Sequence, residues 1–570
     1  MRALAYQGSV CNRLRVPFMT LPPAQPAPVL LDGDARTARR LGWLFLLLAP
    51  LAHGALTLAF GMDANWDLRN YHWYNGYALL NGRIDLDLLP AQMPTFYNPL
   101  LDVAFYGLAS ALPARVAGFV WGTVQGINLS LLFLLAQACL RVNVAMLRTV
   151  AAMLLALMGG LGGGTLGLLG TTFHDNLVSL GVIAALVVVA RALPLLKTGR
   201  LVMAFGRVAF AGLFAGAAMG LKNPTVIYAV GLCLAFLALP AHPVRRLFLA
   251  FFFGLGVLAG LAGTGGFWMI HLWHDYGNPV FPHMNHVFQS PFAAMSDYVN
   301  ASFFPASRLE RLLFPFTFTF APLTVGEVPW FDLRALALFV LVPLAALSAL
   351  ALRRIRPAGF GLADAAATRF LLVALTVTYA LWVVMFCIYR YLVPLEMLAP
   401  LALVMAVGLL PLSRRWAVRV SIALLLVIQA TVQPADWGRV PWPSPDGPGR
   451  WVTAEVPPIE DPHATMVLMG GYWAISHVIP SFPPGVRFVR IQSNFLQPDS
   501  VGNGYLAILK DKVSSHRGPY LMLSTIPDTA GAAKAALRLG LRLDPERCRP
   551  IPNNLGETLN LCAVARVAVE

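Results

Sequence analysis

Long apolar runs alternate with short polar segments along most of the chain. A helix needs about 20 apolar residues to cross a hydrocarbon layer roughly 30 Å thick, and about eleven runs reach that length. The predicted spans are 41–61, 115–140, 147–170, 177–195, 204–222, 224–240, 247–271, 331–352, 368–388, 392–411 and 416–433. Only Lys222-Asn223-Pro224 separates the fifth from the sixth, so these two alternatively form one broken helix. The pattern predicts a polytopic membrane protein.

Lysine and arginine gather in every second connection between these spans. The basic connections contain Arg141 and Arg148; Arg191, Lys197, Arg200 and Arg207; Arg245 and Arg246; Arg353, Arg354 and Arg356; and Arg414, Arg415 and Arg419. Because cytoplasmic loops carry such clusters, the N-terminus is predicted to be cytoplasmic. The same clusters account for the net charge of +15 without a nucleic-acid partner.

Three outward segments, 62–112, 272–330 and 434–570, are too long to be turns. The last alternates strand-like runs, at Thr465–Met469, Arg487–Ile491 and Tyr520–Ser524, with helix-like stretches, which indicates a small α/β domain. The predicted organisation is a basic cytoplasmic tail (1–40), a transmembrane domain (41–433) and a periplasmic α/β domain (434–570). Cys548 and Cys562 share this last domain and can form a disulfide if it is periplasmic.

Composition supports a membrane location. The chain is 58% hydrophobic and only 12% charged, with a mean hydropathy of +0.66, whereas soluble domains are about 25% charged. The basic tail before residue 41 and the length of the first apolar run distinguish it from a cleavable signal, whose apolar core has about 7–15 residues. The first run is therefore predicted to be a transmembrane helix.

The first outward segment concentrates the candidate chemistry. Gly61–Tyr106 carries five aspartates and many aromatic residues directly after a predicted span. Apolar and aromatic residues recur at helical spacing between Trp66 and Leu80, which predicts an amphipathic helix on the membrane surface. This helix would hold Asp67 at the water–lipid boundary with Tyr71 and Tyr74 on the same side. The alternative is plain interfacial anchoring by the aromatic side chains.

The run Asp67-Leu68-Arg69-Asn70-Tyr71-His72, followed by Tyr77-Ala78-Leu79-Leu80-Asn81-Gly82-Arg83, resembles the first periplasmic loop of type-C glycosyltransferases. That superfamily includes protein mannosyltransferases and aminoarabinose transferases. Its motif is usually an Asp-Glu pair with a tyrosine three residues after the glutamate. The spacing from Asp67 to Tyr71 agrees, but Leu68 stands where the glutamate would be. This departure leaves open whether a divalent cation takes part.

The resemblance implies an all-α polytopic fold of the type-C kind for roughly the first 400 residues. It further implies that Asp67 is the general base, which deprotonates the acceptor as it attacks the anomeric carbon of a polyprenyl-phosphate-linked hexose or pentose. The reaction would invert configuration, and the phosphate leaving group would need cations nearby. Tyr71 and His72 would then shape the donor pocket.

Three charged residues at other outward helix ends are candidates to assist. Asp175, in Phe173-His174-Asp175-Asn176, would bind the acceptor, orient the base or join a metal site; an ordinary helix N-cap is the alternative. Lys222 and Arg390 would bind the donor phosphate, Arg390 with two parallel hydrogen bonds. Snorkelling of the two long side chains to the interface is the alternative.

The stretch from His271 to His286 contains four histidines and an aspartate, which raises the question of a metal site. These are His271, His274, Asp275, His283 and His286. No pair has the His-to-His spacing of a zinc hydrolase helix, and Gly277-Asn278-Pro279 marks a turn. We expect this segment to shape the acceptor entrance, and no metal ligand is assigned.

The combined prediction is an inner-membrane glycosyltransferase of a bacterium. It would transfer a sugar from a polyprenyl-phosphate donor to a periplasmic lipid, glycan or protein. One alternative is a transporter or flippase of a lipid-linked glycan, although neither an internal repeat nor an acid at the membrane midplane is evident. A second is a non-catalytic scaffold that binds a partner through its C-terminal domain.

Overall fold

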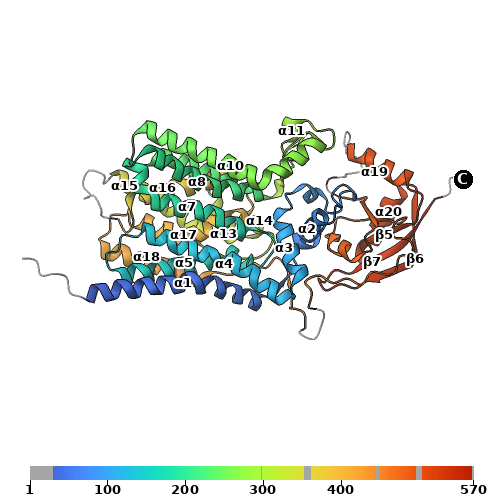
Figure 1. Cartoon of the computed structure of the whole chain (residues 1–570), viewed down its shortest axis with the longest axis horizontal. Coiled ribbons are helices and arrows are strands. Elements are labelled where there is room, and N and C mark those ends of the chain that lie inside the picture. The colour runs from blue at the N-terminus through green and yellow to red at the C-terminus, as the bar shows by residue number, and fades with distance from the viewer. Residues whose placement is uncertain are drawn as a thin grey trace, which may run out of the picture.

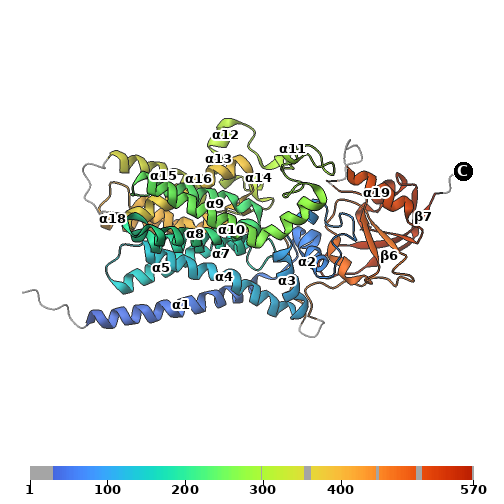
Figure 2. The ribbon, with the colours of Figure 1, turned by 45° about the horizontal axis from the view of Figure 1, so that its top comes forward.

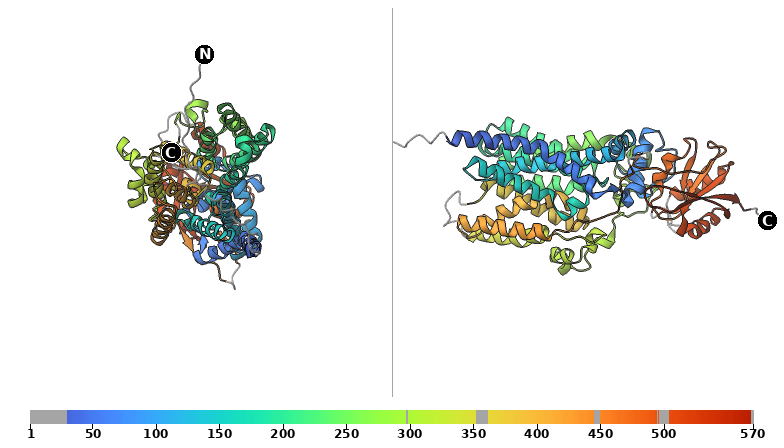
Figure 3. Two further views of the ribbon diagram at one scale, coloured as in Figure 1. Left: turned by 90° about the vertical axis from the view of Figure 1, so that its left-hand side faces the viewer. Right: turned by 90° about the horizontal axis from the view of Figure 1, so that it is seen from below.

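The computed structural model describes residues 30–296, 298–351, 361–444, 449–493, 495 and 504–567. A long bundle of helices runs along the molecule, and a smaller domain with a β-sheet covers one end of it (Figures 1 and 3). Most of the predicted basic tail, residues 1–29, and the cluster Arg353, Arg354 and Arg356 lie outside the described residues.

The bundle is built from long apolar helices whose bounds follow the hydropathy pattern. They are α1 (Leu30–Phe60), α4 (Ala114–Cys139), α5 (Ala145–Gly160), α7 (Asp175–Thr198), α8 (Leu201–Leu221), α9 (Val226–Ala235), α10 (Pro243–Tyr276), α15 (Arg334–Ala351), α16 (Ala365–Met385), α17 (Val393–Val407) and α18 (Arg414–Thr431). Within the described residues, eight helical segments are long and apolar enough to cross a membrane. The chain is therefore a multi-pass membrane protein.

The predicted total of about eleven spans is not confirmed. Three further predicted spans coincide with helices that are shorter or more charged than these eight segments. They are 147–170, 224–240 and 416–433. α5 has 16 residues, and the helical segment Asn223–Ala238 is equally short. α18 begins with Arg414 and Arg415 and contains Arg419 in its second turn. Between α8 and α9 the backbone of Lys222 is extended, so the predicted fifth and sixth spans correspond to two separate helices.

Small residues bring α8 and α10 unusually close together. A Cβ atom on Gly216 would lie 2.0 Å from the carbonyl oxygen of Val257, and one on Gly256 would lie 2.0 Å from that of Ala209. Only glycine fits at such crossings, and small residues commonly mediate helix packing in membranes. This contact fixes the outward end of α8, which carries Lys222.

Two of the three predicted outward segments pack against the end of the bundle that faces the sheet domain. The first contains η1 (Leu68–His72), α2 (Trp73–Leu80), η2 (Met93–Phe96) and α3 (Leu100–Ala111). The second contains α11 (Asn285–Phe288), η5 (Ala301–Phe303), α12 (Arg308–Leu312), α13 (Phe314–Phe320) and α14 (Leu323–Gly326). α12 and α13 lie on the outer side of the bundle (Figure 2), where Leu309, Leu312 and Phe320 are exposed. Such a surface suits contact with lipid.

The C-terminal domain contains a five-stranded mixed sheet in the order β4-β3-β5-β7-β6. Its strands are β3 (Met466–Met469), β4 (Arg487–Arg490), β5 (Tyr520–Thr525), β6 (Leu541–Ile551) and β7 (Leu559–Arg566), with helices α19 (Gly504–Ser515) and α20 (Thr529–Leu537). β3 is parallel to β4 and to β5, whereas β7 is antiparallel to both β5 and β6. Cys548 and Cys562 are opposite each other in β6 and β7 and form a disulfide.

The first outward segment joins the bundle to this sheet. Leu88 pairs with Val489 of β4 and thereby covers the edge of the sheet, while β1 (Met62–Asp63) pairs with β2 (Arg439–Val440). Arg83 donates hydrogen bonds to the carbonyl oxygens of Pro484 and Val486, at 2.7 and 2.6 Å. These contacts bury the first segment between the two parts of the molecule.

The prediction that Trp66–Leu80 lies on the membrane surface is wrong. Residues Leu68–His72 form a π-helical turn before α2, and Tyr71, Tyr74 and Tyr77 pack against buried residues of the C-terminal domain. Tyr74 points to Asp87, with a 2.9 Å hydrogen bond, and not toward Asp67. The aromatic side chains therefore contact protein, because the C-terminal domain covers the face that the sequence pattern suggested for lipid.

Candidate active site

The predicted base Asp67 lies at the end of the bundle that faces the C-terminal domain, immediately before the π-helical turn. One of its carboxylate oxygens, Oδ2, accepts a hydrogen bond from the hydroxyl of Tyr71 at 3.1 Å. The same oxygen accepts a second bond, at 3.2 Å, from Nη1 of Arg390 in η6 (Tyr389–Leu392), at the start of the last apolar span. The side chain of Asp67 keeps 16% of its surface exposed, so a reactant can approach it.

The π-helical turn explains how Tyr71 reaches Asp67. The two residues are four positions apart, and positions with this separation face the same side of a helical segment. Asp67 itself is anchored through its neighbour: Asn65 accepts a hydrogen bond from the backbone nitrogen of Leu68 at 2.7 Å. Asp63 in turn accepts from the backbone and hydroxyl of Thr172, at 2.8 and 2.9 Å. The loop that carries Asp67 is thus fixed to the turn before α7, which contains Thr172.

A second ion pair lies at the start of α7. Nζ of Lys222 donates to Oδ1 of Asp175 at 2.7 Å and to the carbonyl oxygen of Phe173 at 2.6 Å. Asp175 is the first residue of α7, yet its side chain forms no N-cap and its Oδ2 atom is buried without a hydrogen-bond partner. The side chain of Lys222 lies inside the protein and does not extend freely along the interface.

Aromatic rings connect the two ion pairs. The guanidinium of Arg390 lies 4.0 Å from the ring centre of Phe173, and the ammonium of Lys222 lies 5.3 Å from the ring of Tyr391. Glu327 is a further carboxylate, 3.9 Å from Nη2 of Arg390. The structure therefore brings together Asp67, Asp175, Lys222 and Arg390, which come from distant parts of the sequence. Such a set of two cations beside an accessible carboxylate can bind an anion and remove a proton.

His72 does not face Asp67. Its Nδ1 atom lies 2.6 Å from Oδ1 of Asp102 in α3, and the same oxygen lies 3.6 Å from Nε2 of His174. The ligand atoms of His72, Asp102 and His174 all lie within 4.8 Å of one another, as a metal-binding group requires. Sequence reasoning assigned no role to Asp102 or His174. A signal was available, because Asp102 is a lone acid inside the apolar run Leu100–Ala111.

The four histidines from His271 to His286 make separate contacts in the structure. His271 and His274 both contact Asp275, with nitrogen–oxygen distances of 3.2 and 2.6 Å. With Asp85 of the first segment, His271 and Asp275 form another group whose spacing would admit an ion, but these side chains are partly or fully exposed. His283 lies over Tyr97, which packs edge-on against Tyr71. His283 therefore lies two ring contacts away from Tyr71 of the candidate site, and the role of this segment as an acceptor entrance stays a prediction.

The sequence also missed an acid inside a membrane-spanning segment. Glu396 of α17 is buried and accepts hydrogen bonds from the backbone of Gly164 and Thr165, the hydroxyl of Thr165 and the hydroxyl of Tyr389, at 2.6–3.0 Å. It fixes the short helix α6 (Gly163–Gly167) against α17. Because its oxygens are fully engaged, its role is structural.

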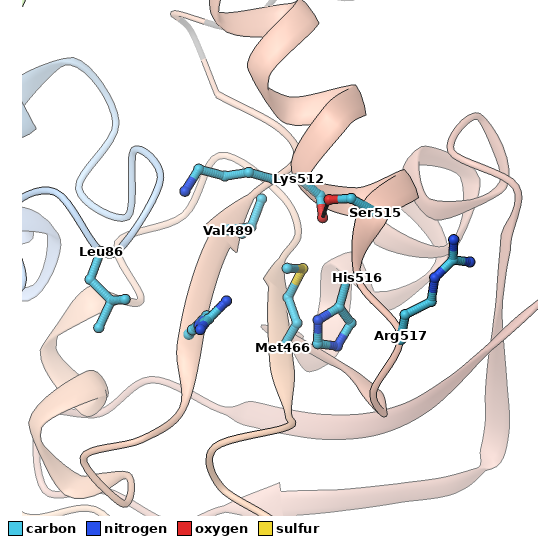
Figure 4. A pocket seen from close by; sticks show the side chains of 8 residues that line it. Leu86, Met466, Val489, Lys512, Ser515, His516 and Arg517 are labelled. Carbon is cyan, nitrogen blue, oxygen red and sulfur yellow. Dashed lines mark hydrogen bonds between the residues drawn. The ribbon is translucent and has the colours of Figure 1, made fainter.

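A separate hollow of about 270 Å³ lies in the C-terminal domain, beside α19 and the first residues of β3 and β4 (Figure 4). Its lining is strongly basic and suits an anionic group. The lining residues are Leu86, Met466, Arg487, Val489, Lys512, Ser515, His516 and Arg517. None of the residues around Asp67 lines it, so it belongs to a different part of the molecule.

Comparison with known proteins gives structural likenesses only. No protein-family model matches the chain, and no curated protein matches its sequence. The structure is similar to the oligosaccharyltransferase of Archaeoglobus fulgidus tethered to an acceptor peptide, with a TM-score of 0.42 and 15% identity over 90% of this chain and 71% of that one.

The apo form of that enzyme gives a TM-score of 0.43 with 14% identity, over 89% of this chain and 72% of the other. Its complex with an inhibitory peptide and a dolichol-phosphate gives 0.41 with 15% identity, over 91% and 73%. These are structural likenesses at low sequence identity. Because each TM-score lies below 0.5, they assign no role to any residue of this chain.

Proposed function

We propose that the chain is a glycosyltransferase of the bacterial inner membrane, with its N-terminus in the cytoplasm and its C-terminal domain in the periplasm. It transfers a sugar from a polyprenyl-phosphate donor to a periplasmic lipid, glycan or protein. One observation carries the proposal: an accessible carboxylate, Asp67, lies beside Arg390 where membrane-spanning helices end. A lipid-linked phosphate presents its reactive carbon at that depth, between water and hydrocarbon.

The proposed reaction uses Asp67 as the general base. Its carboxylate takes the proton from an acceptor hydroxyl or amine while the acceptor atom attacks the anomeric carbon. The bond between that carbon and the phosphate oxygen breaks, and polyprenyl phosphate leaves with the electron pair. Attack from the side opposite the phosphate inverts the configuration. A positioned base commonly contributes about 10²–10⁴-fold to the rate, which is the contribution required of Asp67.

The cations would act on the leaving group. Arg390 offers a planar pair of donors that matches a phosphate, and Lys222 supplies a second positive charge held by Asp175. Both side chains keep 11–18% of their surface exposed, so neither is sealed from a ligand. Negative charge that develops on the phosphate is stabilised where it forms, without rearrangement of the site.

Tyr71 and Asp175 would support this chemistry without reacting themselves. Tyr71 holds the Asp67 carboxylate through its hydroxyl, and Asp175 orients Lys222. His72 is too engaged with Asp102 to shape the donor pocket directly. Its proposed role is therefore to hold the turn that bears Tyr71.

A lipid-linked glycan flippase is the alternative function. It would need charged groups along a path through the membrane, and the buried acid Glu396 is the nearest candidate. Its four hydrogen bonds to the surrounding protein disfavour such a path. The clustering of Asp67, Arg390, Lys222 and Asp175 at one end of the bundle favours chemistry there.

The test uses purified protein in proteoliposomes with a panel of radiolabelled polyprenyl-phosphate sugars and extracted envelope lipids, glycans and proteins as acceptors. A glycosyltransferase releases polyprenyl phosphate and labels an acceptor with inverted anomeric configuration. A flippase moves intact donor between leaflets and labels nothing. Translocation without transfer would contradict the proposal, and so would a product of retained configuration.

A further inference from the structure

Three buried ligand groups converge beside the proposed active site from three different elements. His72 comes from the π-helical turn, Asp102 from the first turn of α3 and His174 from the residue before α7. Each side chain is almost fully buried, with 3%, 2% and 6% of the residue exposed. Two imidazoles and a carboxylate at this spacing are a ligand set that zinc accepts.

The hydrogen bonds within this group do not pair all of its polar atoms. Nε2 of His72 and Nε2 of His174 are both buried without a hydrogen-bond partner. Only one short contact is made, between Nδ1 of His72 and Oδ1 of Asp102. Buried polar atoms are nearly always paired, so two orphaned imidazole nitrogens beside one carboxylate indicate a missing partner that accepts their lone pairs.

The chemistry of the ligands favours a metal ion as that partner. A neutral imidazole nitrogen binds a metal through its lone pair, and the carboxylate of Asp102 offers an oxygen ligand beside both rings. A divalent cation would satisfy all three groups at once.

The backbone at His174 is held in an uncommon conformation. Its φ angle is +66°, in the left-handed region that non-glycine residues rarely adopt. Such strain persists where the surrounding structure imposes it and is concentrated at functional sites. Here it orients the imidazole toward Asp102 and His72, immediately before Asp175 of the candidate active site.

We propose that His72, Asp102 and His174 bind a divalent transition-metal ion of the zinc class, in a site that does not include Asp67. The ion would hold the π-helical turn, α3 and the turn before α7 together. His72 is five residues after Asp67, and His174 is adjacent to Asp175, so the ion would position both ion pairs. No step of the proposed reaction takes place at this metal site. The metal site is therefore a property additional to the proposed function.

The chain offers a matched control. Asp85, His271 and Asp275 have comparable ligand spacing but are partly or fully exposed, and His271 and His274 already bond to Asp275. Asp275→Asn therefore removes a carboxylate from a histidine cluster without touching the buried group. It should leave the metal content unchanged.

The experiment measures metal in protein purified without chelator and without a histidine tag. Inductively coupled plasma mass spectrometry should find about one zinc ion per chain in the wild type, and the same in Asp275→Asn and Asp67→Asn. The metal should be lost from Asp102→Asn and His174→Gln. A chelator should lower the Tm of the wild type, and added Zn²⁺ should restore it.

A second measurement covers variants that fail to fold. Wild-type protein stripped of metal and titrated with Co²⁺ should develop the visible absorption of a site with imidazole ligands. Absence of both native metal and the Co²⁺ spectrum would overturn the proposal. So would metal that stays in the folded Asp102→Asn variant. Because Asp67→Asn keeps the ion, failure of the metal site and failure of the proposed catalytic base are separate results.

Discussion

Arg390 donates a hydrogen bond from Nη1 to Oδ2 of Asp67 over 3.2 Å, although 323 residues separate them in the chain. The contact joins the first outward segment to the start of the last apolar span. It places a permanent cation against the carboxylate that is proposed to take the acceptor proton. A donor phosphate that enters the site would compete with Asp67 for this guanidinium and release the carboxylate to act.

Arg390→Gln should weaken donor binding and also slow the chemical step, because Arg390 is proposed to stabilise the leaving phosphate. Loss of one bidentate phosphate contact is expected to raise the KM for the donor about tenfold, equivalent to ~1.4 kcal/mol. Arg390→Lys should recover part of this loss, since charge returns without the planar donor pair. The measurement is kcat and KM against donor concentration, with Arg419→Gln as the control for an exposed arginine at the start of α18. Equal KM values for Arg390→Gln and wild type would remove Arg390 from the donor site.

The Lys222–Asp175 pair should show strong coupling in a double-mutant cycle. Breaking a buried ion pair leaves an uncompensated charge and costs about 3–5 kcal/mol; Lys222 is 18% exposed, so about 2–4 kcal/mol is expected for Lys222→Met. The double variant Lys222→Met with Asp175→Asn should lose less stability than the sum of the single variants. Thermal unfolding in detergent gives the comparison. Additive losses would show that the two side chains do not interact.

His477 should make the contact between the C-terminal domain and the first outward segment sensitive to acid. Burial lowers the pKa of His477 to about 4 from the usual 6.5, and its ring contacts the carbonyl oxygen of Arg69. In the unfolded chain His477 is protonated below about pH 6.5, whereas in the folded chain it is protonated only below about pH 4. The free energy of unfolding is therefore unaffected by His477 above pH 6.5. It falls as the pH is lowered from 6.5 to 4, by up to about 3 kcal/mol.

Thermal unfolding of wild type and His477→Asn at pH 7.5 and pH 5 checks this prediction. The drop in Tm from pH 7.5 to pH 5 should be smaller in the variant, because the titrating group is gone. His516→Asn, which changes a half-exposed histidine in the same domain, serves as the control. An identical drop in wild type and His477→Asn would contradict the assignment.

Much of the fold could be predicted because it depends on local pattern. Runs of apolar residues set the long helices, and three strand-like runs identified β3, β4 and β5 almost to the residue. The sequence did not reveal β6, in which charged residues and Pro550 interrupt the apolar pattern. Nor did it reveal the covering of Tyr71 and Tyr74 by the C-terminal domain, because amphipathicity alone cannot distinguish a lipid surface from a protein surface.

The candidate site was predictable where charge stands out against an apolar background. Asp67, Asp175, Lys222 and Arg390 were each unusual at the end of an apolar run, and the structure places them together. His72 was predicted to shape the donor pocket because it follows Tyr71 in the sequence. In the structure it faces Asp102 and His174. Pairing of that kind depends on three separate elements and has no local signature.

The most direct test of the proposed function is the initial rate of sugar transfer by wild type, Asp67→Asn and Asp436→Asn with the same donor and acceptor. Asp436 is an exposed aspartate and controls for loss of a carboxylate. Asp67→Asn is expected to remain folded, with a Tm lowered by the loss of its ion pair with Arg390, and to transfer about 10²-fold more slowly or worse, whereas Asp436→Asn should transfer normally. Equal rates for wild type and folded Asp67→Asn would contradict the assignment of Asp67 as the base.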